Sequence, residues 1–149
     1  MRLTSWEKRW FEAIMEGFAP PTSTVGLAPQ PGEVDYARAF EELNGHASPI
    51  AQAGLRAAIH FIGTSPTWTG TKAATIDQLP IEERSALLEK LVSHPQLLVR
   101  ELVWLVKVQG SMALFGTPSI RARSGYDRGR AEKMPVRLRA KSSVRSEVV

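Results

Sequence analysis

The sequence predicts an all-α protein: a small bundle of about five helices with a long central apolar helix and a disordered basic C-terminal tail. Apolar residues recur at the three- and four-residue spacing of an α-helix in five segments. No convincing strand is found in the helical part of the chain, and the only alternating segment, residues 136–141, lies in the basic tail. The 149 residues, 43% of them hydrophobic, are enough for one domain with its own core.

The first predicted helix begins after Thr4, and Glu7, three residues later, completes a capping box. Its inward face is formed by large apolar side chains at helical spacing: Trp6, Trp10, Phe11, Ile14, Met15 and Phe18. Prolines 20 and 21 end the helix. Residues 20–32 hold four prolines, so they predict an extended connection.

Two shorter helices follow in the middle of the chain. Residues 35–43 predict a helix that ends at Asn44 and turns Tyr36, Phe40 and Leu43 inward. Ser48 and Pro49 give the N-cap and first turn of a helix that runs through Ile62. One face of it carries only small residues, which predicts a close helix contact and an interior position: Ala53, Gly54, Ala57 and Ala58. Residues 63–75 predict a loop.

Two further helices complete the predicted bundle. Asp77 begins a helix with acidic residues in its first turns and an inward face of Leu87, Leu88 and Leu91. Residues 95–116 then predict a long helix that is apolar around most of its circumference. Such a helix must be covered on several sides. It is therefore either the axis of the bundle or partly covered by a partner. The chain after Pro118 predicts irregular structure.

The charge distribution divides the chain into a helical domain, residues 1–127, and a basic flexible tail, residues 128–149. The tail holds seven Lys or Arg against two Glu, whereas the rest of the chain is nearly neutral. Nucleic-acid binding by the folded domain is therefore not expected. The tail itself is either a solubilising end, a segment that binds phosphates or an anionic membrane, or a strand added to a partner's sheet.

The N-terminal segment predicts no signal peptide, because Glu7, Lys8 and Glu12 interrupt its apolar residues. The long apolar helix does not predict a membrane span, because Arg100 and Lys107 lie well inside it. We expect a cytoplasmic protein that would be exported only with a partner carrying the signal.

No catalytic, cofactor-binding or metal-binding residue is predicted. The chain has no cysteine, and His46, His60 and His94 lie in separate segments without metal-ligand spacing. Helix caps or core hydrogen bonds are the roles expected for them. Residues 63–72 are rich in Gly and Thr but lack the ending of a phosphate-binding loop. We therefore expect an ordinary loop at residues 63–72, in which Trp68 packs either on the bundle or on a partner.

Two segments together resemble a known group of proteins. LTSWEKRWFEAIMEGFAPP, residues 3–21, resembles the helix that opens many bacterial proteins and domains attached to glucose-methanol-choline (GMC) flavoprotein oxidoreductases. It also resembles the small subunit 3 family of gluconate 2-dehydrogenase. Residues 79–127 resemble the same proteins in an acid-capped helix, a long apolar helix, a proline-marked turn and a Gly-Tyr-Asp ending. The two segments cover about half of the chain.

The resemblance implies a non-catalytic, stabilising or chaperone-like accessory subunit of a flavin-dependent alcohol, sugar or sterol oxidoreductase. FAD and the catalytic base would lie on the large flavoprotein subunit, and no cofactor is expected in this chain. The expected partner interface comprises Trp68, Trp104, Met112, Phe115 and Tyr126. The alternative is that these side chains form the core of the bundle.

Three features depart from the resembled pattern: the missing export signal, the proline-rich segment at residues 20–32 and the basic tail. Two other functions remain open. One is a helical protein-interaction module whose basic tail binds an anionic partner, and the other is a stand-alone enzyme.

Overall fold

The computed structural model describes residues 1–21 and 27–125, and these residues form helices and no strand, which confirms the predicted all-α class. The predicted tail, residues 128–149, lies outside the described residues. Within them there are seven α-helices and one 3₁₀ helix: α1 (Ser5–Phe18), α2 (Tyr36–Leu43), α3 (Pro49–Gly63), α4 (Ser65–Trp68), η1 (Ile76–Gln78), α5 (Ile81–Val92), α6 (Leu97–Gly116) and α7 (Pro118–Ser124).

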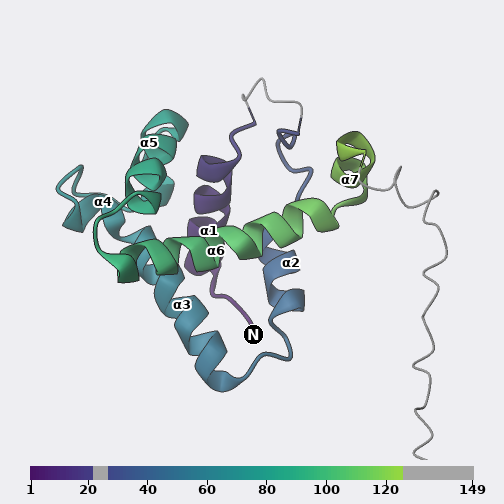
Figure 1. The fold of residues 1–149 in the computed structure, drawn as a ribbon, viewed down its shortest axis with the longest axis horizontal. Coiled ribbons are helices and arrows are strands. Elements are labelled where there is room, and N and C mark those ends of the chain that lie inside the picture. Colours follow the sequence, from purple (N-terminus) through teal and green to yellow (C-terminus); the bar gives the residue numbers. More distant parts are fainter. Residues whose placement is uncertain (22–26, 126–149) are drawn as a thin grey trace, which may run out of the picture.

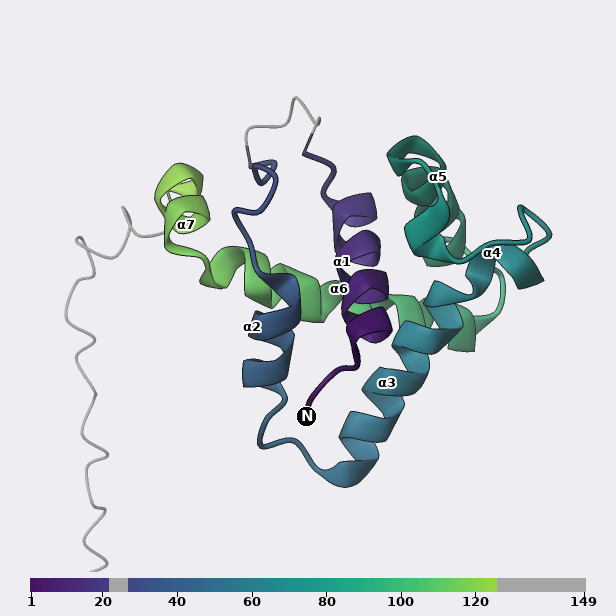
Figure 2. The same cartoon turned by 180° about the vertical axis from the view of Figure 1, so that it is seen from behind.

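Helix α1 has neighbours on most of its sides. It contacts α2, α3, α5 and η1, and α6 crosses over one side of this group (Figure 1). Seen from behind, α1, α2 and α3 lie in front of α6 (Figure 2). The long helix α6, expected at the centre, therefore covers one side of the core and turns its other face away from it.

Helix α1 begins with the predicted capping box. The Thr4 hydroxyl accepts the N–H of Glu7, and the Glu7 carboxylate accepts the N–H of Thr4 at 2.8 Å. Phe11, Ile14 and Met15 are buried, as predicted, because this face of α1 meets α3, α5 and α6.

The same carboxylate joins α1 to α3. Glu7 Oε1 accepts a hydrogen bond from His60 Nε2 at 2.8 Å and forms an ion pair with Arg56 Nε at 2.8 Å, while Oε2 accepts the capping bonds from Thr4. Burial alone would raise the pKa of Glu7, but the bonds from Thr4 and His60 and the Arg56 charge lower it below its ordinary value. His60 thus has the core hydrogen bond expected of it.

Two glycines set the distances between helices. A side chain on Gly63, at the end of α3, would collide with the indole ring of Trp10 on α1. A side chain on Gly110, in the middle of α6, would collide with the sulfur of Met15. Glycine at these two positions lets α3 and α6 approach α1 closely enough to bury its apolar face.

Several positions predicted to face inward are exposed. On α1, Trp6 is 36% exposed at the surface beside α3. Leu43 is 45% exposed, because α2 ends at Asn44 and the Asn44 side chain turns inward instead. The small-residue face of α3 is also exposed at Ala53, Gly54 and Ala57. Helix α3 packs through the larger side chains Leu55, Ile59 and Ile62, which bury more apolar surface, and only Ala58 of the small set is buried.

The helix expected from Asp77 begins later, at Ile81. Asp77 lies in η1, and Pro80 occupies the N-cap of α5. A residue that precedes proline is driven to extended backbone, and Leu79 has ψ 146°, so η1 and α5 cannot be continuous. Helices α4 and α7 also lie where the sequence predicted a loop and irregular structure.

Helix α7 is fastened to the turn before α2. Glu33 accepts a bidentate pair from Arg123, with both N···O distances at 2.9 Å, and a 2.6 Å hydrogen bond from the Ser119 hydroxyl. The bonds from Arg123, Ser119 and the Gln30 N–H lower the pKa of Glu33 to about 2. The carboxylate therefore stays charged, and keeps its pairing with Arg123, at all but strongly acidic pH.

Candidate interaction surface

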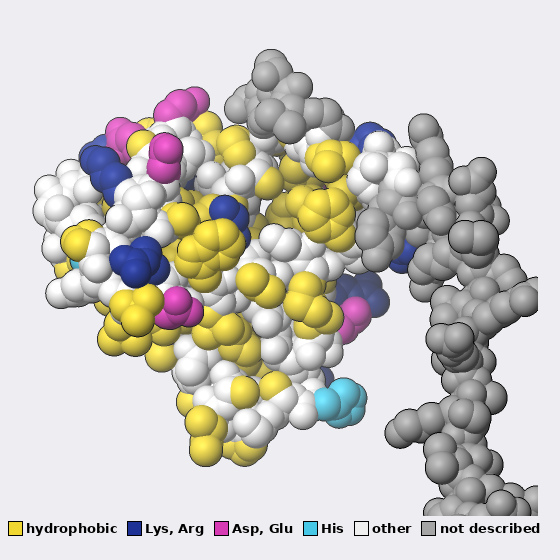
Figure 3. Space-filling view, in the orientation of Figure 1, with side chains coloured by type: hydrophobic (Ala, Val, Ile, Leu, Met, Phe, Trp, Pro, Cys, Tyr) yellow, Lys and Arg dark blue, Asp and Glu magenta, His cyan; other side chains and the backbone are white. Residues whose placement is uncertain are grey.

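Helix α6 has one buried face and one exposed face. The buried face consists of small and β-branched residues: Val99, Val103, Val106, Gly110 and Ala113. The opposite face carries seven large hydrophobic side chains that the rest of the described chain leaves exposed: Leu97, Leu98, Trp104, Leu105, Val108, Met112 and Phe115. We call these seven residues the α6 face. In Figure 3, hydrophobic side chains gather on the side of the molecule that α6 crosses.

The α6 face follows the geometry of one helix stripe. Leu97, Trp104, Val108 and Phe115 are seven, four and seven residues apart, so at 100° per residue they lie almost above one another. Leu98, Leu105 and Met112 repeat every seven residues along one flank of that line. A stripe of this kind is typical of a helix that packs against another protein element.

Polar contacts fix the orientation of α6. The buried Asn44 side chain donates to the Phe40 carbonyl at 2.9 Å and to Gln109 Oε1 at 3.0 Å, which ties α2 to the middle of α6. At the other end, Arg100 Nη1 donates to the carbonyls of His94 and Pro95 and closes the turn before α6. The exposed side chains thus lie on a helix that is held at its first turn and near its middle.

Two charged side chains, Lys107 and Glu101, lie beside or within the α6 face. Lys107 Nζ lies 4.9 Å from the centre of the Trp104 ring and 5.3 Å from that of Phe18, so the cation is held over aromatic faces. Among the described residues no carboxylate lies within 4 Å of this ammonium. Glu101 is exposed between Leu97 and Trp104 on the same stripe.

The predicted interface residues fall into three groups. Trp104, Met112 and Phe115 share the α6 face, with 46%, 50% and 45% of their surface exposed, so they do not form the core of the bundle. Trp68 lies on α4, 42% exposed, beside a cavity near the start of α6. Tyr126 lies outside the described residues.

Four members of the α6 face were not singled out by the sequence: Leu97, Leu98, Leu105 and Val108. A helix that is apolar on nearly every side does not reveal which apolar positions its own chain will cover. Residue size is a partial signal, because the covered face carries valine, glycine and alanine while the exposed face carries leucine, methionine and aromatics, with Val108 as the exception.

The described residues bring no metal-ligand cluster together. Residues 1–21 and 27–125 contain no group of three His, Asp or Glu side chains placed to hold an ion. His94 accepts the N–H of Gln96 through Nδ1, and His46 is exposed. The same part of the chain contains no helix with both the length and the hydropathy needed to cross a bilayer.

Comparisons of this chain with protein-family models, with curated proteins and with solved structures found no match in any of the three. The resemblance to subunits of GMC flavoprotein oxidoreductases therefore stays a prediction from residues 3–21 and 79–127.

Proposed function

We propose that this protein is a non-catalytic accessory subunit that docks through the α6 face on the large subunit of a flavin-dependent alcohol, sugar or sterol oxidoreductase. In this proposal the partner holds FAD and the catalytic base, and this chain stabilises the partner or assists its folding. The complex forms in the cytoplasm and leaves it only if the partner carries an export signal.

The observation that carries the docking role is the exposure of the α6 face. Seven large hydrophobic side chains on one helix amount to several hundred Å² of apolar surface, on the order of the largest patch that a monomeric protein usually exposes. Patches of this size are often functional. A standard protein interface buries about 800 Å² on each partner, so the α6 face supplies a large share of one.

The flavoprotein as partner is supported by the resemblance of the two segments. Helix α1 corresponds to the first segment, while α5, α6 and α7 lie within the second. In this proposal α1 supports the fold, because it packs against most other helices, and α6 supplies the surface that the large subunit covers.

The test uses the full chain and a purified FAD-containing GMC flavoprotein whose gene adjoins the gene of this chain. Size-exclusion chromatography with light scattering is expected to detect a stable complex of the two. Met112→Glu places a charge in the middle of the α6 face and is expected to weaken the complex by about 100-fold or more, because an unpaired charge is costly in an apolar interface.

Ile50→Glu is the matched control. Ile50 is 86% exposed at the start of α3 and lies outside the α6 face, so this variant is expected to leave the complex intact. Absence of a complex, or equal weakening by both variants, would contradict the proposal.

A further inference from the structure

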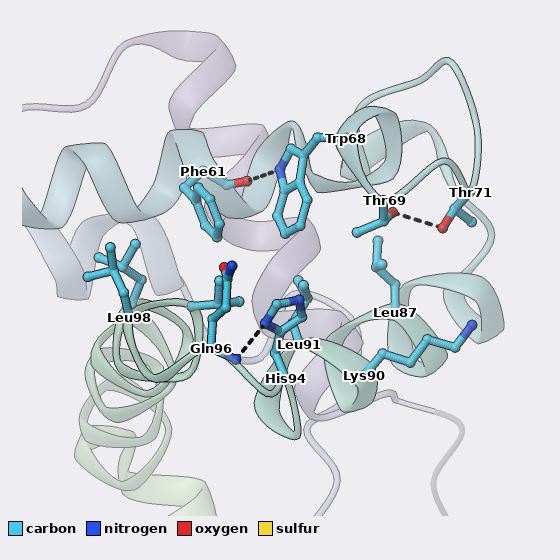
Figure 4. A pocket seen from close by; sticks show the side chains of 12 residues that line it. Phe61, Trp68, Thr69, Thr71, Leu87, Lys90, Leu91, His94, Gln96 and Leu98 are labelled. Atoms are coloured by element: carbon cyan, nitrogen blue, oxygen red, sulfur yellow. Dashed lines mark hydrogen bonds between the residues drawn. The ribbon is translucent and has the colours of Figure 1, made fainter.

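A cavity of about 590 Å³ opens where α6 begins, at the end of the helix away from α7 (Figure 1). Its walls come from α3, α4, α5 and the first turns of α6, and it shares only Leu98 with the α6 face. Figure 4 shows the rings of Phe61 and Trp68 on one side and Leu91 and His94 on the opposite side. A volume of this size is ordinary for the binding site of a small molecule.

The aromatic wall is formed by Phe61 and Trp68, which contact each other directly. Trp68 Nε1 donates a 3.1 Å hydrogen bond to the Phe61 carbonyl, and the two ring centres lie 4.7 Å apart. This bond holds a half-exposed indole against the Phe61 ring. On the opposite side Leu87, Leu91 and Val99 line the cavity, and because they are buried only the edges of these aliphatic side chains are accessible from it.

Three of the side chains at this cavity are polar groups that a ligand can reach: His94 and Lys90 offer protons, and the Gln96 amide offers both a donor and an acceptor. His94 Nδ1 accepts the N–H of Gln96 at 3.2 Å, so the neutral imidazole carries its proton on Nε2, which faces the space beneath the Trp68 indole (Figure 4). Lys90 lies at the edge of the cavity, and among the described residues no carboxylate is within 4 Å of its ammonium. The Thr69 and Thr71 hydroxyls are occupied with each other at 2.9 Å.

We propose that this cavity binds a small apolar molecule that carries one carboxylate, of the class of medium-chain fatty acids. The hydrocarbon chain lies between the aromatic pair and the buried leucines. The carboxylate accepts a hydrogen bond from His94 Nε2. The Lys90 side chain extends away from His94 along the edge of the cavity in Figure 4, so its ammonium adds a favourable charge to the site without a direct contact. This site is a further function of the chain, and it requires neither the flavoprotein partner nor the α6 face.

Isothermal titration calorimetry of the full chain with three probes tests the proposal: octanoate, octan-1-ol and octylammonium. Octanoate is expected to bind saturably, one molecule per chain, and about fivefold more tightly than octan-1-ol, since an exposed opposite charge contributes about 1 kcal/mol. Octylammonium is expected to bind more weakly than either. No partner protein is present in the titration, so its failure and failure of the proposed docking are independent outcomes.

Two variants measure separately what the Trp68 ring and the Lys90 charge contribute to octanoate binding. Trp68→Ala is expected to weaken octanoate binding about tenfold, because it removes one apolar wall. Lys90→Glu is expected to abolish the preference for octanoate over octan-1-ol while leaving the affinity for octan-1-ol unchanged. Lys90 is exposed, so this second variant decides the question even if Trp68→Ala fails to fold.

Trp104→Ala and Lys107→Glu are the matched controls, because both residues lie outside the cavity. They are expected to leave octanoate binding unchanged. Three results would overturn the proposal: no saturable binding of octanoate at millimolar concentrations, octylammonium binding as tightly as octanoate, or a loss from Trp104→Ala equal to that from Trp68→Ala. The last result would indicate adsorption on the α6 face.

Discussion

At the scale of single residues, the Glu7 carboxylate both caps α1 and joins α1 to α3. One of its oxygens caps α1 through Thr4, and the other accepts a hydrogen bond from His60 of α3 and pairs with the charge of Arg56. The capping half was predictable, because a capping box is a local pattern of two residues three apart. The half that joins α1 to α3 was not, because its partners lie about fifty residues away in the sequence.

Glu7→Gln is expected to lower the free energy of unfolding at pH 7 by about 1–3 kcal/mol. The neutral amide replaces the carboxylate charge, so the donors that contact Glu7 lose their charged acceptor. The pKa of Glu7 is lowered in the folded state, so its contribution is complete above the unfolded pKa and is lost as pH falls through the folded pKa. Urea denaturation at pH 7 and at about pH 3 measures both effects. The variant is expected to lose less stability than the wild type between these two pH values.

Glu42→Gln is the control for this measurement. Glu42 forms an exposed pair with Arg38 on α2, and such pairs contribute about 0.3–0.5 kcal/mol. If both variants lost the same free energy of unfolding at pH 7, the buried Glu7 would stabilise the fold no more than an exposed carboxylate does.

At the scale of elements, helix starts marked by a local cap were predictable, whereas the start of α5, the short helices α4 and α7 and several helix faces were not. Ser48 and Pro49 begin α3 as expected, because an N-cap and a first-turn proline act within a few residues. The exposure of Gly54 and Leu43 was not predictable, since it depends on which neighbouring helices arrive and from which side. The candidate site shows the same division: the apolar excess of α6 was evident from sequence, while the face left exposed was not.

Two glycines of α3 are expected to respond oppositely to alanine. Gly63→Ala is expected to lower the free energy of unfolding by about 1–3 kcal/mol, because the added carbon meets the Trp10 ring. Gly54→Ala is expected to raise it by up to about 1 kcal/mol, because Gly54 lies in the helix interior with open space around it. Thermal unfolding followed by circular dichroism compares them, and equal shifts of the same sign would contradict the helix contact described here.

At the scale of the whole molecule, the apolar α6 face and the basic tail predict different responses to salt. Docking through the α6 face is expected to change less than about twofold in affinity between 50 and 200 mM salt, since apolar burial does not depend on released counterions. Binding through the tail to a polyanion would fall by about 10³ or more if six or more cations took part. Titrating the complex with the flavoprotein at both salt concentrations distinguishes the accessory subunit from a module that binds through its tail.

The four tryptophans of this chain sit in three separate environments. Trp6 and Trp10 pack edge to face beside His60 where α1 meets α3, Trp68 lines the cavity, and Trp104 stands on the α6 face. Fluorescence emission from variants that keep one tryptophan would therefore report on these regions one at a time. Unfolding, small-molecule occupancy and partner capture become separable optical signals without any attached label.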